Sequence, residues 1–165
     1  MAGAALCRVQ PVHEGEAGPP DAHRRAVRLR AAQRGPESPW TVYSPMQSGR
    51  LTGAFTRERA ARLPEDDWRS RSPDYTGEGL ERNLRLAAAL EPVAERHGVS
   101  PAAVSVAWTL AWRGVTGAIV GARNPEQVDG WLAAATLELT DADMAEIAEA
   151  IRSSGAGSGP ELPGS

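Results

Sequence analysis

The sequence predicts an α/β fold in which helices predominate. Two short apolar runs, at residues 40–44 and 115–120, have the length and composition of buried β-strands. Between them lie residues 78–97 and 101–113, which carry apolar side chains at the 3.6-residue period of amphipathic helices. Strands that alternate with helices in this way are expected to lie parallel and to be joined by a right-handed crossover.

Composition separates the first 38 of the 165 residues from the residues that follow. Residues 1–38 show no sustained apolar period and carry six arginines against four acids, whereas residues 39–152 carry twelve arginines against sixteen acids. This change predicts a boundary near Pro39, with an unstructured segment before it and a structured domain over residues 39–152. A basic nucleic-acid-binding tail and a transit peptide are alternatives for residues 1–38. Interrupting acids and the lack of interleaved aromatic residues argue against both.

The first strand is expected at Trp40 to Ser44, and it ends at Pro45 because proline cannot donate to a central ladder. The following residues 54–76 are polar, rich in arginine and interrupted by two prolines. They predict a long surface loop.

Two helices follow this loop. Residues 78–97 predict one helix of about five turns that ends at Gly98. Ser100 is expected to cap the next helix, whose first residue is Pro101 and which runs to Arg113. Two tryptophans of this second helix are expected in the core: Trp108 and Trp112.

The second strand is expected at residues 115–120, directly after a stop at Gly114. Its nearly unbroken apolar run is typical of a strand covered on both faces in a parallel sheet. Asn124 and Pro125 then start another helix, with Gln127 as the capping-box partner.

The last helix is expected to begin at the capping pair Thr140 and Asp143 and to run to about Ile151. Beyond it, residues 153–165 are rich in glycine, serine and proline and predict a loose tail.

The overall composition is that of a soluble, cytoplasmic protein. Hydrophobic residues make up 41% of the chain, the net charge is −3, and no apolar run reaches the ~20 residues of a membrane span. The single Cys7 cannot form an internal disulfide, and we expect no redox role for it. The histidines show no metal-ligand spacing. Neither a nucleic acid nor a membrane is an expected partner.

A Ser/Pro/Gly loop directly after the first strand could hold an anion. The backbone N–H groups of Gln47, Ser48 and Gly49, together with the hydroxyls of Ser44 and Ser48, could hydrogen-bond a pyrophosphate. An ordinary strand-ending turn is the alternative interpretation.

A second anion site is predicted after the second strand. Gly121, Ala122 and Arg123 precede a capped helix N-terminus, and Arg123 offers a planar fork that matches a phosphate. The alternative is a solvated arginine beside a helix cap.

Both motifs resemble the aldo-keto reductase family. The pattern Y-S-P-L-x-x-G-x-L-T-G of that family is matched by Tyr43, Ser44, Pro45, Met46, Gly49, Leu51, Thr52 and Gly53. Residues 115–128 resemble the family's last strand and phosphate loop, so that the resemblance covers residues 40–152. A complete eight-stranded barrel takes about 250 residues. The resemblance therefore implies the C-terminal fragment of a (β/α)8 TIM barrel, a truncated form of the family's enzyme.

The resemblance implies an NADP(H)-dependent oxidoreductase that reduces small carbonyl substrates to alcohols. The implied contacts of Arg123 are to the 2′-phosphate of NADP, and those of Gln127 are to the adenosine. Trp131 stands where the family commonly has an asparagine, and Arg50 stands where it often has an apolar residue. The full set of implied cofactor-binding residues is Ser44, Pro45, Met46, Gln47, Ser48, Gly49, Leu51, Gly121, Arg123 and Gln127.

No catalytic residue is predicted in this chain. The family's catalysis uses a tyrosine, a lysine, an aspartate and usually a histidine, yet all 18 basic residues here are arginine. Tyr43 and Tyr75 do not match the catalytic tyrosine, and His97 is expected to cap the end of a helix. The alternative function is a non-catalytic remnant that binds nucleotide weakly or complements another chain.

Overall fold

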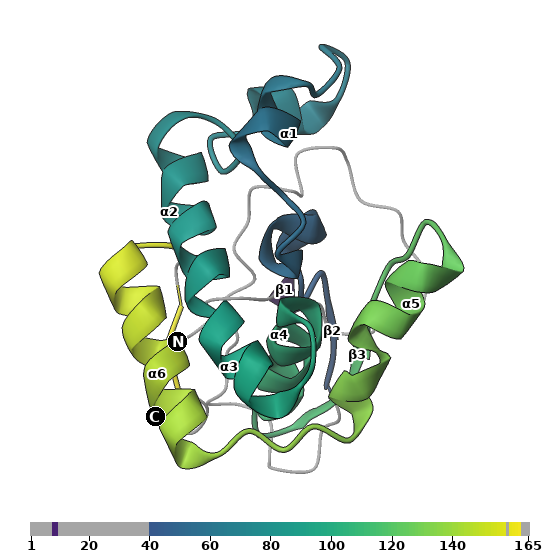
Figure 1. Ribbon diagram of the computed structural model, residues 1–165, viewed down its shortest axis with the longest axis vertical. Coiled ribbons are helices and arrows are strands. Elements are labelled where there is room, and N and C mark those ends of the chain that lie inside the picture. The colour runs from purple at the N-terminus through teal and green to yellow at the C-terminus, as the bar shows by residue number, and fades with distance from the viewer. Residues whose placement is uncertain (1–7, 10–39, 158, 163–165) are drawn as a thin grey trace.

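The computed structural model describes residues 8–9, 40–157 and 159–162, and its centre is a small sheet (Figure 1). The strands are β1 (Arg8–Val9), β2 (Trp40–Tyr43) and β3 (Val115–Ile119), in the order β1-β2-β3. β2 and β3 are parallel, with Val42 opposite Ala118, as the sequence predicts. The two strands therefore end on the same side of the sheet.

Strand β1 lies within residues 1–38, for which the sequence predicts no regular structure. It pairs antiparallel with β2, in the register Val9 opposite Val42. This pairing satisfies an edge of β2 that would otherwise leave backbone groups unpaired. The rest of residues 1–38 lies outside the described residues.

Most of the described chain is helical. Between β2 and β3 lie η2 (Gln47–Thr52), α1 (Arg57–Ala61), η3 (Trp68–Arg71), α2 (Gly77–Ala89), α3 (Glu91–His97) and α4 (Pro101–Leu110). After β3 come α5 (Pro125–Leu132), η4 (Ala133–Ala135) and α6 (Asp141–Ser154). Figure 1 shows α6 alongside α2 on one side of the molecule and α5 on the other, with α4 between them. None of the described helices is long and apolar enough to cross a membrane.

The prediction of a single helix over residues 78–97 is wrong, because α2 and α3 are separate helices that meet at Leu90. Pro92 explains the break. It has no N–H to donate to the preceding turn, and its ring would clash with the carbonyl four residues earlier. The chain instead ends α2 with a tighter bond, from Leu90 N–H to the Ala87 carbonyl at 3.2 Å, and restarts with Pro92 in the first turn of α3.

The prediction of a long surface loop over residues 54–76 is also wrong. The segment contains the short helices α1 and η3, and it buries Phe55 and Tyr75 in a small cluster with Leu80. The Tyr75 ring meets Phe55 edge to face at 5.4 Å. The polar composition hid these helices, which lie between the two buried aromatic residues that anchor the segment.

Helix α4 forms the centre of the core. The Ser100 side chain accepts a hydrogen bond from Ala103 N–H at 3.1 Å, so that the predicted cap is confirmed. Trp108 is fully buried and meets the half-buried Trp112 edge to face at 5.1 Å. The helix ends at Leu110, three residues before the predicted Arg113.

Strand β3 is not covered on both faces, contrary to the prediction from its apolar run. None of its residues is fully buried, and Ile119 is 62% exposed. The described helix that packs against β3 is α4, which covers one face. Ile119, the last residue of β3, lines the cavity described below, so the apolar run serves that cavity as well as the core.

The predicted capping pair of the last helix is confirmed, and it is tied to α3. The Thr140 hydroxyl accepts from Asp143 N–H at 3.2 Å, and the Asp143 carboxylate accepts from Thr140 N–H at 2.9 Å. Asp143 is fully buried and also pairs with Arg96 and, at 2.8 Å, with Nε2 of His97. His97 therefore binds a carboxylate rather than capping helix carbonyls. Burial opposes ionisation of Asp143, but these hydrogen bonds outweigh it and hold its pKa well below the usual range.

The end of α6 corrects the prediction of a loose tail from residue 153. The helix continues to Ser154, and Ala156 is buried in the main core. Gly155 takes a left-handed φ of 66°, which ends the helix and turns the chain back.

Candidate functional site

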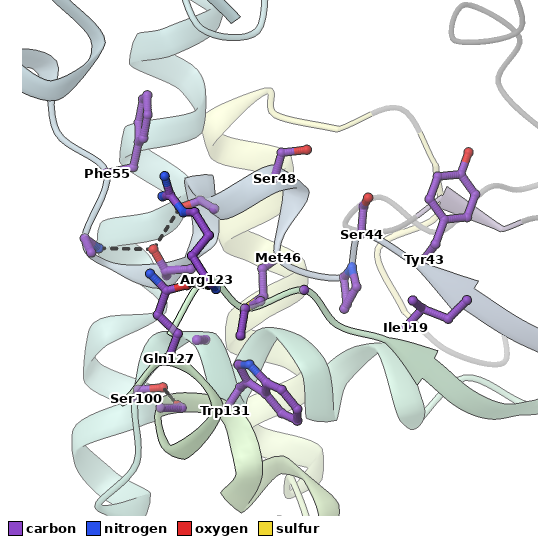
Figure 2. A pocket seen from close by; sticks show the side chains of 18 of the residues that line it. Tyr43, Ser44, Met46, Ser48, Phe55, Ser100, Ile119, Arg123, Gln127 and Trp131 are labelled. Carbon is purple, nitrogen blue, oxygen red and sulfur yellow. Dashed lines mark hydrogen bonds between the residues drawn. The ribbon is translucent and has the colours of Figure 1, made fainter. Parts of the chain in front are cut away.

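A cavity of about 690 Å³ lies where β2 and β3 end, and this volume suits a small-molecule ligand. Its walls come from the loop after β2, the segment of α1 and η3, the loop after β3, the start of α4, and α5. In Figure 2, Arg123 lies between Ser48 of the first loop and the α5 residues Gln127 and Trp131. The parallel pairing of the strands brings the two predicted anion-binding loops together.

The first loop has an unusual backbone. Ser44, Gln47 and Ser48 have positive φ angles of 56°, 50° and 54°, followed by Gly49 at 95°. Residues other than glycine adopt this region at an energetic cost, so the surrounding structure must hold the loop. One support comes from α4, where the buried Ser105 hydroxyl donates to the Pro45 carbonyl at 2.8 Å.

The structure changes which N–H groups of this loop are candidates for a ligand. The Gln47 N–H already donates to the Ser44 carbonyl at 2.9 Å, and the Gly49 N–H donates to the Met46 carbonyl at 3.0 Å. Of the three predicted donors, Ser48 N–H is the one left to consider. The Ser48 side chain is exposed and, with Ser44, lines the cavity.

Arg50 faces away from the cavity, beneath the loop. It is 6% exposed, its Nε donates to the Gln47 carbonyl at 3.2 Å, and its Nη1 lies 3.2 Å from Oδ2 of Asp74. Its guanidinium also stacks over the Tyr75 ring at 4.8 Å, while the Tyr75 hydroxyl donates to the same Gln47 carbonyl at 3.0 Å. The contacts of Arg50 favour a role in packing of the loop over a phosphate contact.

The second loop is fixed by its own side chains. The Asn124 side chain accepts from Gln127 N–H at 3.0 Å, which confirms the predicted cap. Oε1 of Gln127 accepts from Arg123 N–H at 2.8 Å, one residue earlier than the reciprocal bond of a standard capping box. Gln127 therefore holds the phosphate loop in shape while it lines the cavity.

All of the predicted cofactor-binding residues line the cavity except Gln47 and Leu51. Those that do are Ser44, Pro45, Met46, Ser48, Gly49, Gly121, Arg123 and Gln127. Leu51 is 1% exposed and belongs to the main core. Oε1 of Gln47 accepts a hydrogen bond from Nη2 of Arg50 at 2.8 Å. These two residues support the loop from below.

The sequence did not single out two further arginines that line the cavity. Arg59 comes from α1 and Arg69 from η3, both in the segment predicted as plain loop. Their approach depends on the folding of residues 54–76, which no local pattern revealed. Together with Arg123 they give the cavity three arginines, and no carboxylate is among its lining residues in the described part of the chain. Such a lining favours an anionic ligand.

Asp67 lies behind this wall and is held by Arg69. The Arg69 side chain donates to both oxygens of Asp67, with Nη2 to Oδ2 at 2.6 Å. These bonds, chiefly, lower the pKa of Asp67 to about 2, and the nearby charge of Arg123 adds to the effect. Asp67 thus stays ionised and compensates much of the charge of Arg69.

Apolar and aromatic side chains complete the cavity. Trp131, Tyr43, Phe55 and Ile119 line it, and Trp131 also packs beside Met46 against the smaller core cluster around α4. Tyr43 is among the lining residues, whereas Tyr75 is buried, and burial raises the pKa of Tyr75. The described residues contain no group of His, Cys, Asp and Glu that could hold a metal ion.

Comparison with known proteins gives consistent matches. A model of the aldo/keto reductase family matches residues 29–152, a range that starts earlier than the motif-based resemblance. The chain is 32% identical over 108 residues to the aldo-keto reductase yakc [NADP(+)] of Schizosaccharomyces pombe, covering 66% of this chain and 31% of that protein. It is 30% identical to the NADH-specific methylglyoxal reductase of Escherichia coli, covering 67% and 33%.

A solved structure agrees with these matches. A glycerol dehydrogenase from Gluconobacter oxydans superimposes with a TM-score of 0.61 at 32% identity, covering 67% of this chain and 33% of that one. The chain thus spans about a third of the length of the proteins it matches.

Proposed function

Because the chain belongs to the aldo/keto reductase family of oxidoreductases, we propose that its cavity binds the adenosine and phosphate portion of NADP(H). We further propose that residues 39–152 correspond to the C-terminal part of a (β/α)8 barrel. In such barrels the loops at the carboxyl ends of the strands carry the functional site. The cavity at the ends of β2 and β3 has this location.

One observation carries this proposal. Two loops that are far apart in the sequence, after β2 and after β3, line a single cavity with three arginines and no carboxylate among the described lining residues. Serine hydroxyls and a helix N-terminus are present beside the arginines. These groups suit a ligand with several phosphate oxygens.

Arg123 supports NADP(H) over NAD(H). Its side chain is exposed in the cavity, and among the described residues no carboxylate lies within ion-pair distance of it. A guanidinium can bind the 2′-phosphate that distinguishes NADP through two parallel hydrogen bonds. The relatives include both an NADP(+) and an NADH-specific protein by name. We therefore expect Arg123 to determine which of the two cofactors this cavity prefers.

The expected reaction of the family member is reduction of a small carbonyl compound to an alcohol, in the cytoplasm. A bound NADPH would supply the hydride. The residues of this chain would bind and orient the dinucleotide through its phosphates. The sequence contains no lysine, so the lysine that lowers the pKa of the family's catalytic tyrosine has no counterpart in it. We propose that carbonyl reduction requires catalytic groups that this sequence does not contain. The alternative is a non-catalytic remnant that binds nucleotide weakly or complements another chain.

Replacing Arg123 by alanine should weaken NADPH binding by about tenfold or more, because a charge-assisted bidentate contact is lost. NADH lacks the 2′-phosphate, so its affinity should change less than about twofold. Dissociation constants for both nucleotides, measured by isothermal titration calorimetry, give the comparison. Arg113→Ala is the matched control, since this exposed arginine precedes the opposite end of β3. Equal losses for NADPH and NADH in Arg123→Ala would remove the proposed role of Arg123.

A further inference from the structure

Arg59 lines the cavity, and local contacts hold its side chain there. It belongs to α1, whose N-cap Thr56 accepts from Arg59 N–H at 3.2 Å. Its guanidinium donates to the Ala54 carbonyl at 3.4 Å and lies 5.9 Å from the centre of the Phe55 ring. Ala54 and Phe55 line the same cavity. These contacts direct the guanidinium along the wall that continues from the loop after β2.

The charge of Arg59 is uncompensated, unlike that of its neighbours. Arg69 is neutralised by its bonds to both oxygens of Asp67. Arg57, two residues earlier on α1, is paired with Glu81 and does not line the cavity. Across the described parts of the chain, Arg59 has no carboxylate within ion-pair distance. It therefore presents a free positive charge and several N–H donors to the cavity.

NADP(H) carries two separate anionic groups, the 2′-phosphate and the diphosphate bridge. Arg123 at the α5 loop accounts for one of them. Arg59 stands beside the wall formed by Gly49, Thr52 and Ala54, which leads directly from the Ser44–Gly49 loop. A diphosphate bound at that loop would lie next to this wall.

We propose that Arg59 binds the diphosphate bridge of the dinucleotide, as a second phosphate-binding arginine that acts independently of Arg123. The proposal rests on the proposed function, because it assumes that the cavity holds a dinucleotide. It assigns to the segment of residues 54–76 a direct part in affinity for any ligand with a diphosphate, whether or not that ligand has a 2′-phosphate.

Three variants of the full chain test this assignment: Arg59→Ala, Arg57→Ala and Arg123→Ala. Arg59→Ala should raise the dissociation constants of NADPH and NADH alike by about tenfold, the effect of one charge-assisted phosphate contact. Arg57→Ala, on the same exposed helix, should leave both unchanged, which controls for the loss of one positive charge. Circular dichroism of each variant confirms that the helices persist, as expected for exposed side chains.

Competition by fragments separates the two phosphate positions. Inorganic pyrophosphate should displace NADPH from the original chain, and its inhibition constant should rise about tenfold in Arg59→Ala. Adenosine 2′-monophosphate has no diphosphate, so Arg59→Ala should leave its inhibition constant unchanged, whereas Arg123→Ala should raise it.

Each contrary result has a distinct meaning. If the dissociation constants of NADPH and NADH for Arg59→Ala are the same as those for Arg57→Ala, Arg59 makes no phosphate contact and the inference is overturned. If Arg59→Ala weakens adenosine 2′-monophosphate as much as pyrophosphate, the diphosphate assignment is overturned. If the unsubstituted chain is folded and binds neither nucleotide, the proposed function fails and this inference fails with it.

Discussion

Replacing Asp143 by asparagine should lower the free energy of unfolding at pH 7 by about 3 kcal/mol, because hydrogen bonds to a buried charged group are among the costlier ones to lose. The carboxylate is fully buried and accepts from Thr140, His97 and Arg96. An asparagine amide would direct a donor at one of these donors. The change breaks both the cap of α6 and its connection to α3. Urea unfolding followed by circular dichroism measures the loss.

The effect of Asp143 should depend on pH in a defined direction. Its folded pKa lies below the unfolded value of 3.8. The stability it contributes is therefore fully present above about pH 4 to 5 and is lost as the pH falls through the folded pKa. The gap between the original chain and Asp143→Asn should narrow steadily below pH 4.

Asp141→Asn is the matched control, since Asp141 is an exposed acid in the same first turn of α6. It should cost less than about 0.5 kcal/mol, the scale of an exposed helix-dipole contact. A constant gap between Asp143→Asn and the original chain from pH 7 to pH 2.5 would contradict the ionised network.

Replacing Arg50 by alanine should cost about 2 kcal/mol of stability and should also weaken nucleotide binding. Arg50 is buried between the first cavity loop and the end of the α1–η3 segment, where it contacts Gln47, Asp74 and Tyr75. Its loss leaves a void and removes a support for backbone held at positive φ. We expect the affinity for NADPH to fall several-fold although Arg50 does not line the cavity.

Two variants separate support of the loop from general destabilisation. Arg57→Ala breaks an exposed ion pair with Glu81 in the same segment and should cost less than about 1 kcal/mol. Tyr75→Phe removes only the hydroxyl that donates to the Gln47 carbonyl, so its effects should have the same sign and be smaller. An Arg50→Ala protein that loses stability yet binds NADPH as tightly as the original chain would show that Arg50 does not position the loop.

Local sequence signals predicted much of the fold. Caps at Ser100, Asn124 and Thr140 appear in the structure with the expected hydrogen bonds, because a cap depends only on residues within one helical turn. The parallel pairing of β2 and β3 followed from the helices between them.

The predictions of secondary structure were wrong where one local sequence signal outweighed another, or where the structure depends on contacts between residues that are distant in the sequence. The apolar period of residues 78–97 continues across Pro92, so periodicity alone predicted one helix where the backbone makes two. The buried position of Tyr75 depends on Gln47, which lies 28 residues away. Pairing of β1 with β2 joins residues more than thirty positions apart.

The candidate site shows the same division. Residues of the two loops were predicted because their motifs are contiguous, and most of them line the cavity. Leu51 lies within the first motif but packs in the core, since a loop motif includes residues that hold its shape as well as residues that contact a ligand. Arg59 and Arg69 reach the cavity only because residues 54–76 fold back against α2, which the sequence did not indicate.

Titration of the full chain with NADPH, followed by tryptophan fluorescence, tests the central claim most directly. Trp131 lines the cavity, so binding there should change its emission, and circular dichroism of the same sample establishes that the chain is folded. We predict saturable binding with a micromolar dissociation constant, and a much smaller fluorescence change in Trp131→Phe. A folded chain that shows no saturable binding of NADPH would contradict the proposal that these two loops form a nucleotide site.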